Sequence, residues 1–231
     1  MNKIWSVLFI AILFTSCKGQ EYEAGIFDLS KLDFHLNADQ FYSKSMNREN
    51  IKMTSGKQYV VKDTIREYDL GGEGDRNKIF GIQFNVKSYS PEDTVAIYKN
   101  FAFSRLEAMT TEKGDLMLIS ATAKCPDKDF KEVIQKMTNE YKPPVIEEKE
   151  FAFFKSYHYT WTLKDRIIQL VSGSKLDFTQ TPHNIIDDKE KKMISEVSKN
   201  KLEEIHVFIC KKEFEKKLKG KMSSGEWSDF K

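Results

Sequence analysis

The segment that most constrains this chain is KEFAFFKSYHYTWTL, residues 149–163, in which aromatic residues recur at alternate positions. In a β-strand, side chains two residues apart point to the same face. Five rings therefore share one face, with Lys155 interrupting them: Phe151, Phe153, Tyr157, Tyr159 and Trp161. Because burying these rings would stabilise a sheet, we expect one face of this strand to be covered by another element.

Residues 127–141, DKDFKEVIQKMTNEY, are expected to form the covering helix. The segment starts with acidic residues, which favour a helix N-terminus, and it stops before Pro143-Pro144. Its apolar residues recur at helical spacing along one side: Phe130, Val133, Ile134, Met137 and Tyr141.

Two interpretations of the aromatic strand stay open. In the first, the whole aromatic face is core beneath the helix. In the second, the tyrosine-rich end extends past the helix and offers Tyr157, Tyr159 and Trp161 as a surface for a sugar, a peptide or another protein.

Turn signals predict antiparallel hairpins along the rest of the chain. Residues 57–68 and 77–89 flank a glycine-rich loop. Residues 95–109 fit both helical spacing and strand alternation, and the strand-like residues 115–123 that follow favour a second hairpin, with Gly114 in its turn at a positive φ. The turn at Lys164-Asp165 predicts another hairpin. Residues 205–210 read as a further strand, and Asn37 with Gln40 three residues later predicts a helix start.

These elements predict an α+β fold with a mainly antiparallel sheet packed by helices. Two arrangements remain open: two tandem α-then-β-meander units, or one ordinary α+β sheet. The expected divisions are a signal peptide, a tether, a first unit, a second unit packed on the first, and a tail: residues 1–16, 17–24, 25–124, 125–221 and 222–231. In architecture alone, the tandem order resembles the β-lactamase inhibitor proteins, and a single unit resembles the small outer-membrane assembly lipoproteins. Function does not transfer with such a likeness.

The N-terminus has the layout of an export signal. Lys3 precedes an apolar stretch from residue 4 to residue 14, which is too short to cross a bilayer of about 30 Å as a helix. Thr15, Ser16 and Cys17 follow, and this stretch resembles the lipobox of bacterial envelope lipoproteins. The resemblance implies cleavage before Cys17, fatty acylation of that residue with chains such as palmitate, and a lipid anchor in the membrane. In enteric lipoproteins, an aspartate after the acylated cysteine is an inner-membrane retention signal. Because Lys18 stands at this position instead, the resemblance implies the outer membrane, and either face of that membrane remains an alternative.

Cys125 and Cys210 would then be the remaining cysteines in an oxidising compartment. Two alternatives stay open for them. They form a disulfide, or each is a buried thiol within its own strand.

The charge balance gives no argument for nucleic acid. The chain holds 37 basic and 35 acidic residues, and removal of residues 1–16 takes only Lys3, leaving 36 and 35. Six lysines gather in residues 211–221. They are either a solvated helix face or a contact with acidic lipid headgroups.

No motif identifies a catalytic residue, a metal site or a cofactor. The four histidines are far apart in sequence, and none has a second histidine or a cysteine at metal-ligand spacing. We therefore expect a non-enzymatic binding module whose partner is an envelope protein or a glycan. The alternatives are an envelope hydrolase whose site is assembled from scattered residues, and an inhibitor or immunity lipoprotein. The sequence does not determine the oligomeric state.

Overall fold

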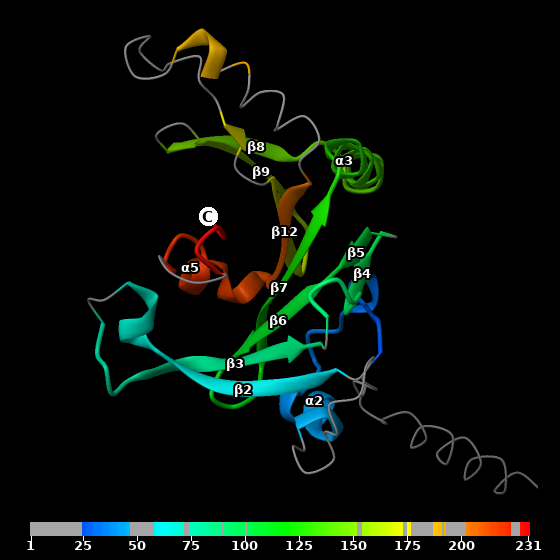
Figure 1. Ribbon diagram of the computed structural model, residues 1–231. Helices are drawn as coiled ribbons and strands as arrows, with labels where there is room; N and C mark the ends of the chain where they lie inside the picture. The colour runs from blue at the N-terminus through cyan, green and yellow to red at the C-terminus, as the bar shows by residue number, and fades with distance from the viewer. Residues whose placement is uncertain are drawn as a thin grey trace, which may run out of the picture.

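The fold is described from a computed structural model (Figure 1). The described residues are 25–46, 58–71, 74–88, 90–99, 101–151, 154–172, 175–176, 187–190, 192, 202–222 and 227–231. The expected signal peptide and tether, Cys17 and Phe153 all lie outside these ranges.

A nine-stranded antiparallel sheet organises the chain, in the order β11-β9-β10-β12-β7-β6-β3-β2, with β8 paired to the other side of β9. Its strands are β2 (Tyr59–Arg66), β3 (Ile79–Lys87), β6 (Arg105–Thr110), β7 (Leu116–Cys125), β8 (Val145–Phe151), β9 (Phe154–Thr162), β10 (Arg166–Val171), β11 (Lys175–Leu176) and β12 (Glu203–Lys211). The predicted α+β class is confirmed.

The order of elements repeats once. Helix α2 (Ala38–Met46) precedes the meander β2-β3-β6-β7, and helix α3 (Asp127–Tyr141) precedes the meander β8-β9-β10-β12. The last strands of the two meanders, β7 and β12, pair antiparallel over eight residues, from the Glu203–Cys125 pair to the Cys210–Leu118 pair. Two α-then-β-meander units thus share one continuous sheet.

Both helices lie on the same face of the sheet, which we call the helix face. Helix α3 has the predicted bounds, and it buries Phe130, Val133 and Met137 against the strands. Helix α2 begins as predicted, because the Asn37 side-chain oxygen accepts a hydrogen bond from the Gln40 backbone N–H at 3.1 Å. The apolar stripes of both helices meet in one core.

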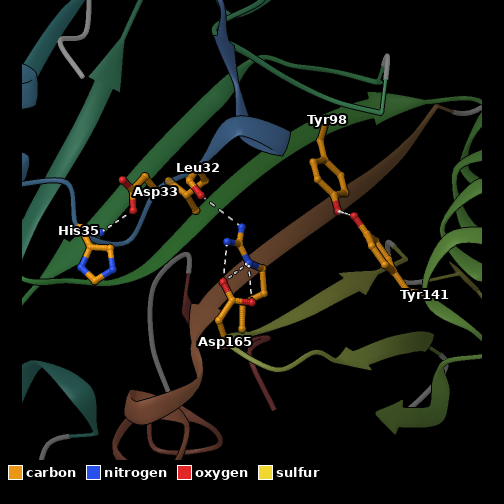
Figure 2. Close-up of polar contacts among 7 residues, drawn as sticks. Leu32, Asp33, His35, Tyr98, Tyr141 and Asp165 are labelled. Carbon is orange, nitrogen blue, oxygen red and sulfur yellow. Dashed lines mark hydrogen bonds and ion pairs between the residues drawn. The ribbon is translucent and has the colours of Figure 1, made fainter. Parts of the chain in front are cut away.

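A small three-stranded sheet lies beside this core and ties the two units together. It contains β1 (Phe27–Asp28), β4 (Ala96–Tyr98) and β5 (Phe101–Phe103), and a 3₁₀ turn, η1 (Leu29–Lys31), follows β1. The hydroxyls of Tyr98 and Tyr141 meet at 3.4 Å, which joins β4 to the end of α3 (Figure 2). Arg166, paired with Asp165, donates to the Leu32 carbonyl at 3.3 Å. These contacts connect the first unit to the second.

The opposite face of the sheet, which we call the C-terminal face, is covered by the end of the chain. The sheet curves around η4 (Lys212–Phe214), α5 (Glu215–Leu218) and the last residues (Figure 1). Residues 222–231 were expected as a tail, but Met222, Trp227 and Phe230 are buried in a second core. The Gln169 amide also donates to the Lys231 carbonyl at 2.8 Å and accepts from the Lys231 N–H at 3.2 Å. The tail prediction is wrong because this segment has large apolar residues that the curved sheet buries.

The aromatic segment is not one strand. Residues 145–151 form β8 and residues 154–162 form β9, and the two pair as a hairpin with Phe151 opposite Phe154. Phe151 therefore does not share a strand with Tyr157. The prediction failed because residues 152 and 153 are Ala and Phe, which give no turn signal.

Two other hairpins follow the predictions, with one change. Strands β2 and β3 pair, and Gly114 stands at φ +90° in the turn between β6 and β7. Residues 95–109 were expected as one strand of that second hairpin, yet they divide into β4, β5 and β6. A 3₁₀ turn, η3 (Glu67–Leu70), follows β2.

Candidate functional site

The three aromatic residues considered as a binding surface lie on β9, on the helix face. Trp161 is only 2% exposed, and its Nε1–H donates to the Lys142 carbonyl at 3.0 Å. Tyr159 is half-buried and meets the Phe130 ring edge-on at 5.8 Å. Tyr157, nearer the β8–β9 turn, is also half-buried. Most of this aromatic surface therefore belongs to the core.

Cys125 and Cys210 are buried thiols that form no disulfide. The sheet register puts Cys125 opposite Glu203 and Cys210 opposite Leu118, at the two ends of the β7–β12 pairing. Seven residues of β7, at about 3.4 Å each, separate these positions, far beyond the Cα separation that a disulfide spans. Burial raises the pKa of Cys210 to about 12, so its thiol is protonated at neutral pH.

Ser156 and His158 form the one described serine–histidine contact that bears on the hydrolase alternative. The Ser156 Oγ lies 3.5 Å from the His158 Nε2, at the limit of a hydrogen bond. The His158 Nδ1 has no hydrogen-bond partner in the described protein, so no carboxylate orients the ring. His158 is also 2% exposed. This contact lacks the orienting acid and the access to substrate that nucleophilic catalysis needs.

Three adjoining depressions form the candidate site, which we call the α3–β6 groove. The first, of about 300 Å³, lies between α3 and the β4–β5 hairpin. Ala102, Cys125 and Val133 line it, and Lys99 and Lys136 contribute charged side chains. Helix α3 and strand β5, which both contribute residues to this depression, lie on the same side of the molecule in Figure 1.

Two further depressions continue the groove along the ends of the strands. The second, of about 390 Å³, shares Ala102 and Lys124 with the first. The third, of about 460 Å³, reaches β3 and shares Pro91, Ser104 and Arg105 with the second. The shared residues show that the three depressions adjoin one another.

Lys99 is held rigidly at the α3 end of the groove. Its ammonium group pairs with the Glu140 carboxylate and lies 5.8 Å and 5.3 Å from the centres of the Tyr98 and Tyr141 rings. Partial burial alone would lower the pKa of Lys99, but hydrogen bonds with Glu140 and Tyr141 outweigh that effect, so the pKa is raised. Lys99 therefore stays charged across the physiological range, and it is anchored as part of the wall.

The lining chemistry suits an extended polypeptide. Five basic and four acidic side chains line the groove: Lys87, Lys99, Arg105, Lys124, Lys136, Glu92, Glu107, Asp129 and Glu132. This near balance provides no concentrated positive field for a phosphate or nucleic acid. The neighbouring aromatic residues Phe101 and Phe103 are buried, which leaves no ring face for stacking a sugar. Leu202, which is 51% exposed, adds an apolar contact on the second depression.

Sequence reasoning did not find this groove, because tertiary contacts assemble it. The short hairpin from β4 to β5 brings Ala102 opposite α3, and the β7–β12 pairing brings Leu202 beside Lys124. Lys99 stands at φ +52° in the structure, in the turn that joins β4 to β5 between Tyr98 and Phe101.

Within the described ranges, no three His, Cys, Asp or Glu side chains gather in a way that could hold a metal ion. Among the helices that the structure describes, none has the length and apolar character needed to span a membrane.

No family model matches the chain. No curated protein and no solved structure matches it either.

Proposed function

We propose that this protein is a lipid-anchored envelope binding module, non-enzymatic, that holds an extended segment of another envelope protein in the α3–β6 groove. The anchor would be a diacylglycerol on Cys17, in line with the lipobox resemblance of residues 13–17. Two or more acyl chains make such an anchor stable, so the domain would act at a membrane surface, with the outer membrane as the expected location.

The observation that carries the binding role is that three open depressions adjoin one another along this side of the protein. Depressions of about 300, 390 and 460 Å³ join through shared residues, and each is open to solvent. Enclosed apolar pockets suit small molecules, whereas an open groove lined by charges of both signs suits a polypeptide segment that lies along it. Val133 and Ala102 supply apolar contact, and Arg105 and Lys136 supply hydrogen-bond donors.

A groove-blocking variant tests the binding role. Ala102 is exposed on β5 within the groove, so Ala102→Arg fills the channel without replacing a core side chain. Thr64→Arg is the matched control, because Thr64 is an exposed position on β2, away from the groove. We expect tagged wild-type protein and Thr64→Arg to capture the same envelope protein from detergent-solubilised membranes, and Ala102→Arg to lose it. Equal capture by both variants would refute binding of the envelope protein in the groove.

The anchor is tested separately. Cys17→Ala removes the only side chain that the lipobox resemblance assigns to acylation. We expect incorporation of labelled palmitate into the wild type and none into this variant. Label retained by Cys17→Ala would refute the anchor and leave the groove untouched.

A further inference from the structure

The sheet ends at β8, and no described strand covers the outer edge of β8. Val145 is 65% exposed and Ile146 is 58% exposed on this strand. An uncovered edge presents backbone N–H and C=O groups that can pair with a strand from another chain. This edge is separate from the α3–β6 groove, so the inference goes beyond the proposed function.

The hydrogen bonds of the neighbouring strand establish which groups point outward. The Tyr157 carbonyl accepts from the Ser172 N–H at 2.9 Å, and the Tyr157 N–H donates to the Ser172 Oγ at 2.8 Å. Tyr157 therefore directs its backbone groups away from β8. In an antiparallel pair, the backbone N–H and C=O groups of two opposite residues either hydrogen-bond to each other or both point away from the pair. Because Glu148 lies opposite Tyr157, its N–H and C=O point to the outer edge of β8. The same alternation makes the backbone groups of Ile146 and Glu150 point outward.

We propose that β8 of one molecule pairs antiparallel with β8 of a second copy of this chain, about a two-fold axis at Glu148. In this register Glu147 lies opposite Lys149 of the second copy, and the symmetry makes this contact twice. Within one molecule these side chains already approach each other at 3.1 Å along the strand, and both are partly exposed. Across the new pair their Cβ atoms would be about 5 Å apart, close enough for a cross-strand ion pair.

The charges of β8 select this register over its neighbours. Sliding one copy by two residues sets Glu147 opposite Glu147, and sliding it the other way sets Lys149 opposite Lys149. Both arrangements oppose like charges. A slip of one residue sets outward backbone groups against inward ones. Glu148 meets its own copy at the axis, and the Lys155 ammonium, which lies 3.0 Å from Glu148 and 2.6 Å from Glu150 of the same molecule, offsets part of this charge.

Paired charge reversals in the full-length chain test this proposal. Two differently tagged copies are expressed together, and their co-capture is measured after membranes are solubilised in mild detergent. In a dimer of the Glu147→Lys variant, a lysine lies opposite a lysine at both symmetric contacts. In a dimer of the Lys149→Glu variant, a glutamate lies opposite a glutamate at both contacts. We expect either variant to pair with itself about tenfold more weakly than the wild type. Glu112→Lys and Lys113→Glu, in the exposed β6–β7 turn, are matched controls that should pair like the wild type.

Complementary variants give the decisive comparison. A Glu147→Lys copy expressed with a Lys149→Glu copy restores both opposite-charge contacts, so this mixed pair should form. The double variant E147K/K149E should pair with itself for the same reason. Absence of wild-type pairing, single variants that pair normally, or a mixed pair that fails to form would each overturn the proposal. A different protein captured through β8 would overturn it as well, because the edge would then have another occupant.

Discussion

Replacement of Trp161 by alanine should destabilise the fold by about 3 to 5 kcal/mol. Trp161 is 2% exposed in the core of the helix face, so the change removes a ring that the sheet and α3 bury almost completely. It also removes the 3.0 Å hydrogen bond to the carbonyl of Lys142, an exposed residue, and such a bond contributes about 0.5 to 1.5 kcal/mol, which is part of the same total. Lys142 stands at φ +75°, where α3 ends, so the lost bond would loosen the link from helix to β8.

Two further variants grade the loss. Trp161→Phe keeps a smaller aromatic ring in the core and loses the Nε1–H donor, so we expect a smaller cost than for alanine, about 1 to 2 kcal/mol. Ile146→Ala changes a side chain that is 58% exposed, and it should stay within about 0.5 kcal/mol of wild type. Urea unfolding measures all three variants, with the midpoint compared at a constant slope. A Trp161→Ala midpoint no lower than that of Ile146→Ala would refute the placement of Trp161 in the core.

Three other outcomes follow from the same structure. Residues 25–231 should unfold in one cooperative transition, since both cores lie within them; fluorescence and circular dichroism curves that fail to coincide would contradict this. Phe230→Ala should lower the free energy of unfolding by about 3 to 5 kcal/mol, because the Phe230 ring is fully buried, with its centre 5.7 Å from that of the Phe208 ring. An unchanged urea midpoint would contradict the placement of Phe230 in the core. Burial lowers the pKa of His158 in the folded protein, although the charge of Asp229 opposes this shift. The unfolded chain therefore binds a proton that the folded protein does not, so the free energy of unfolding should be highest above about pH 6.5 and should fall as the pH drops below that value. Urea midpoints measured from pH 5 to 7.5 should show this decline in the wild type and a flatter curve for His158→Gln.

Local patterns were enough to predict much of the fold. The α3 segment has acidic residues at its start, one apolar stripe and prolines after its end, and all three signals act within the segment itself. Gly114 and the Asn37 cap are likewise local, because a positive φ and a side-chain cap depend on near neighbours.

The features that sequence reasoning missed depend on distant contacts or on a turn without turn residues. The β8–β9 break falls between Phe151 and Phe154, and the sequence has no glycine or proline between them. The burial of Phe230 depends on contacts with strands far away in the sequence, such as that with Phe208 of β12. The α3–β6 groove needs β5 to lie against α3, and no spacing within either segment predicts that contact.

The binding role is tested most directly by photo-cross-linking in intact cells. A benzophenone side chain placed at position 102 would lie within the groove, and one at position 64 would serve as the control on β2. If the groove holds an extended segment of an envelope protein, position 102 should give one discrete adduct, and mass spectrometry should map it to a short continuous stretch of that protein. No adduct at position 102, or the same adduct from position 64, would contradict the proposed function.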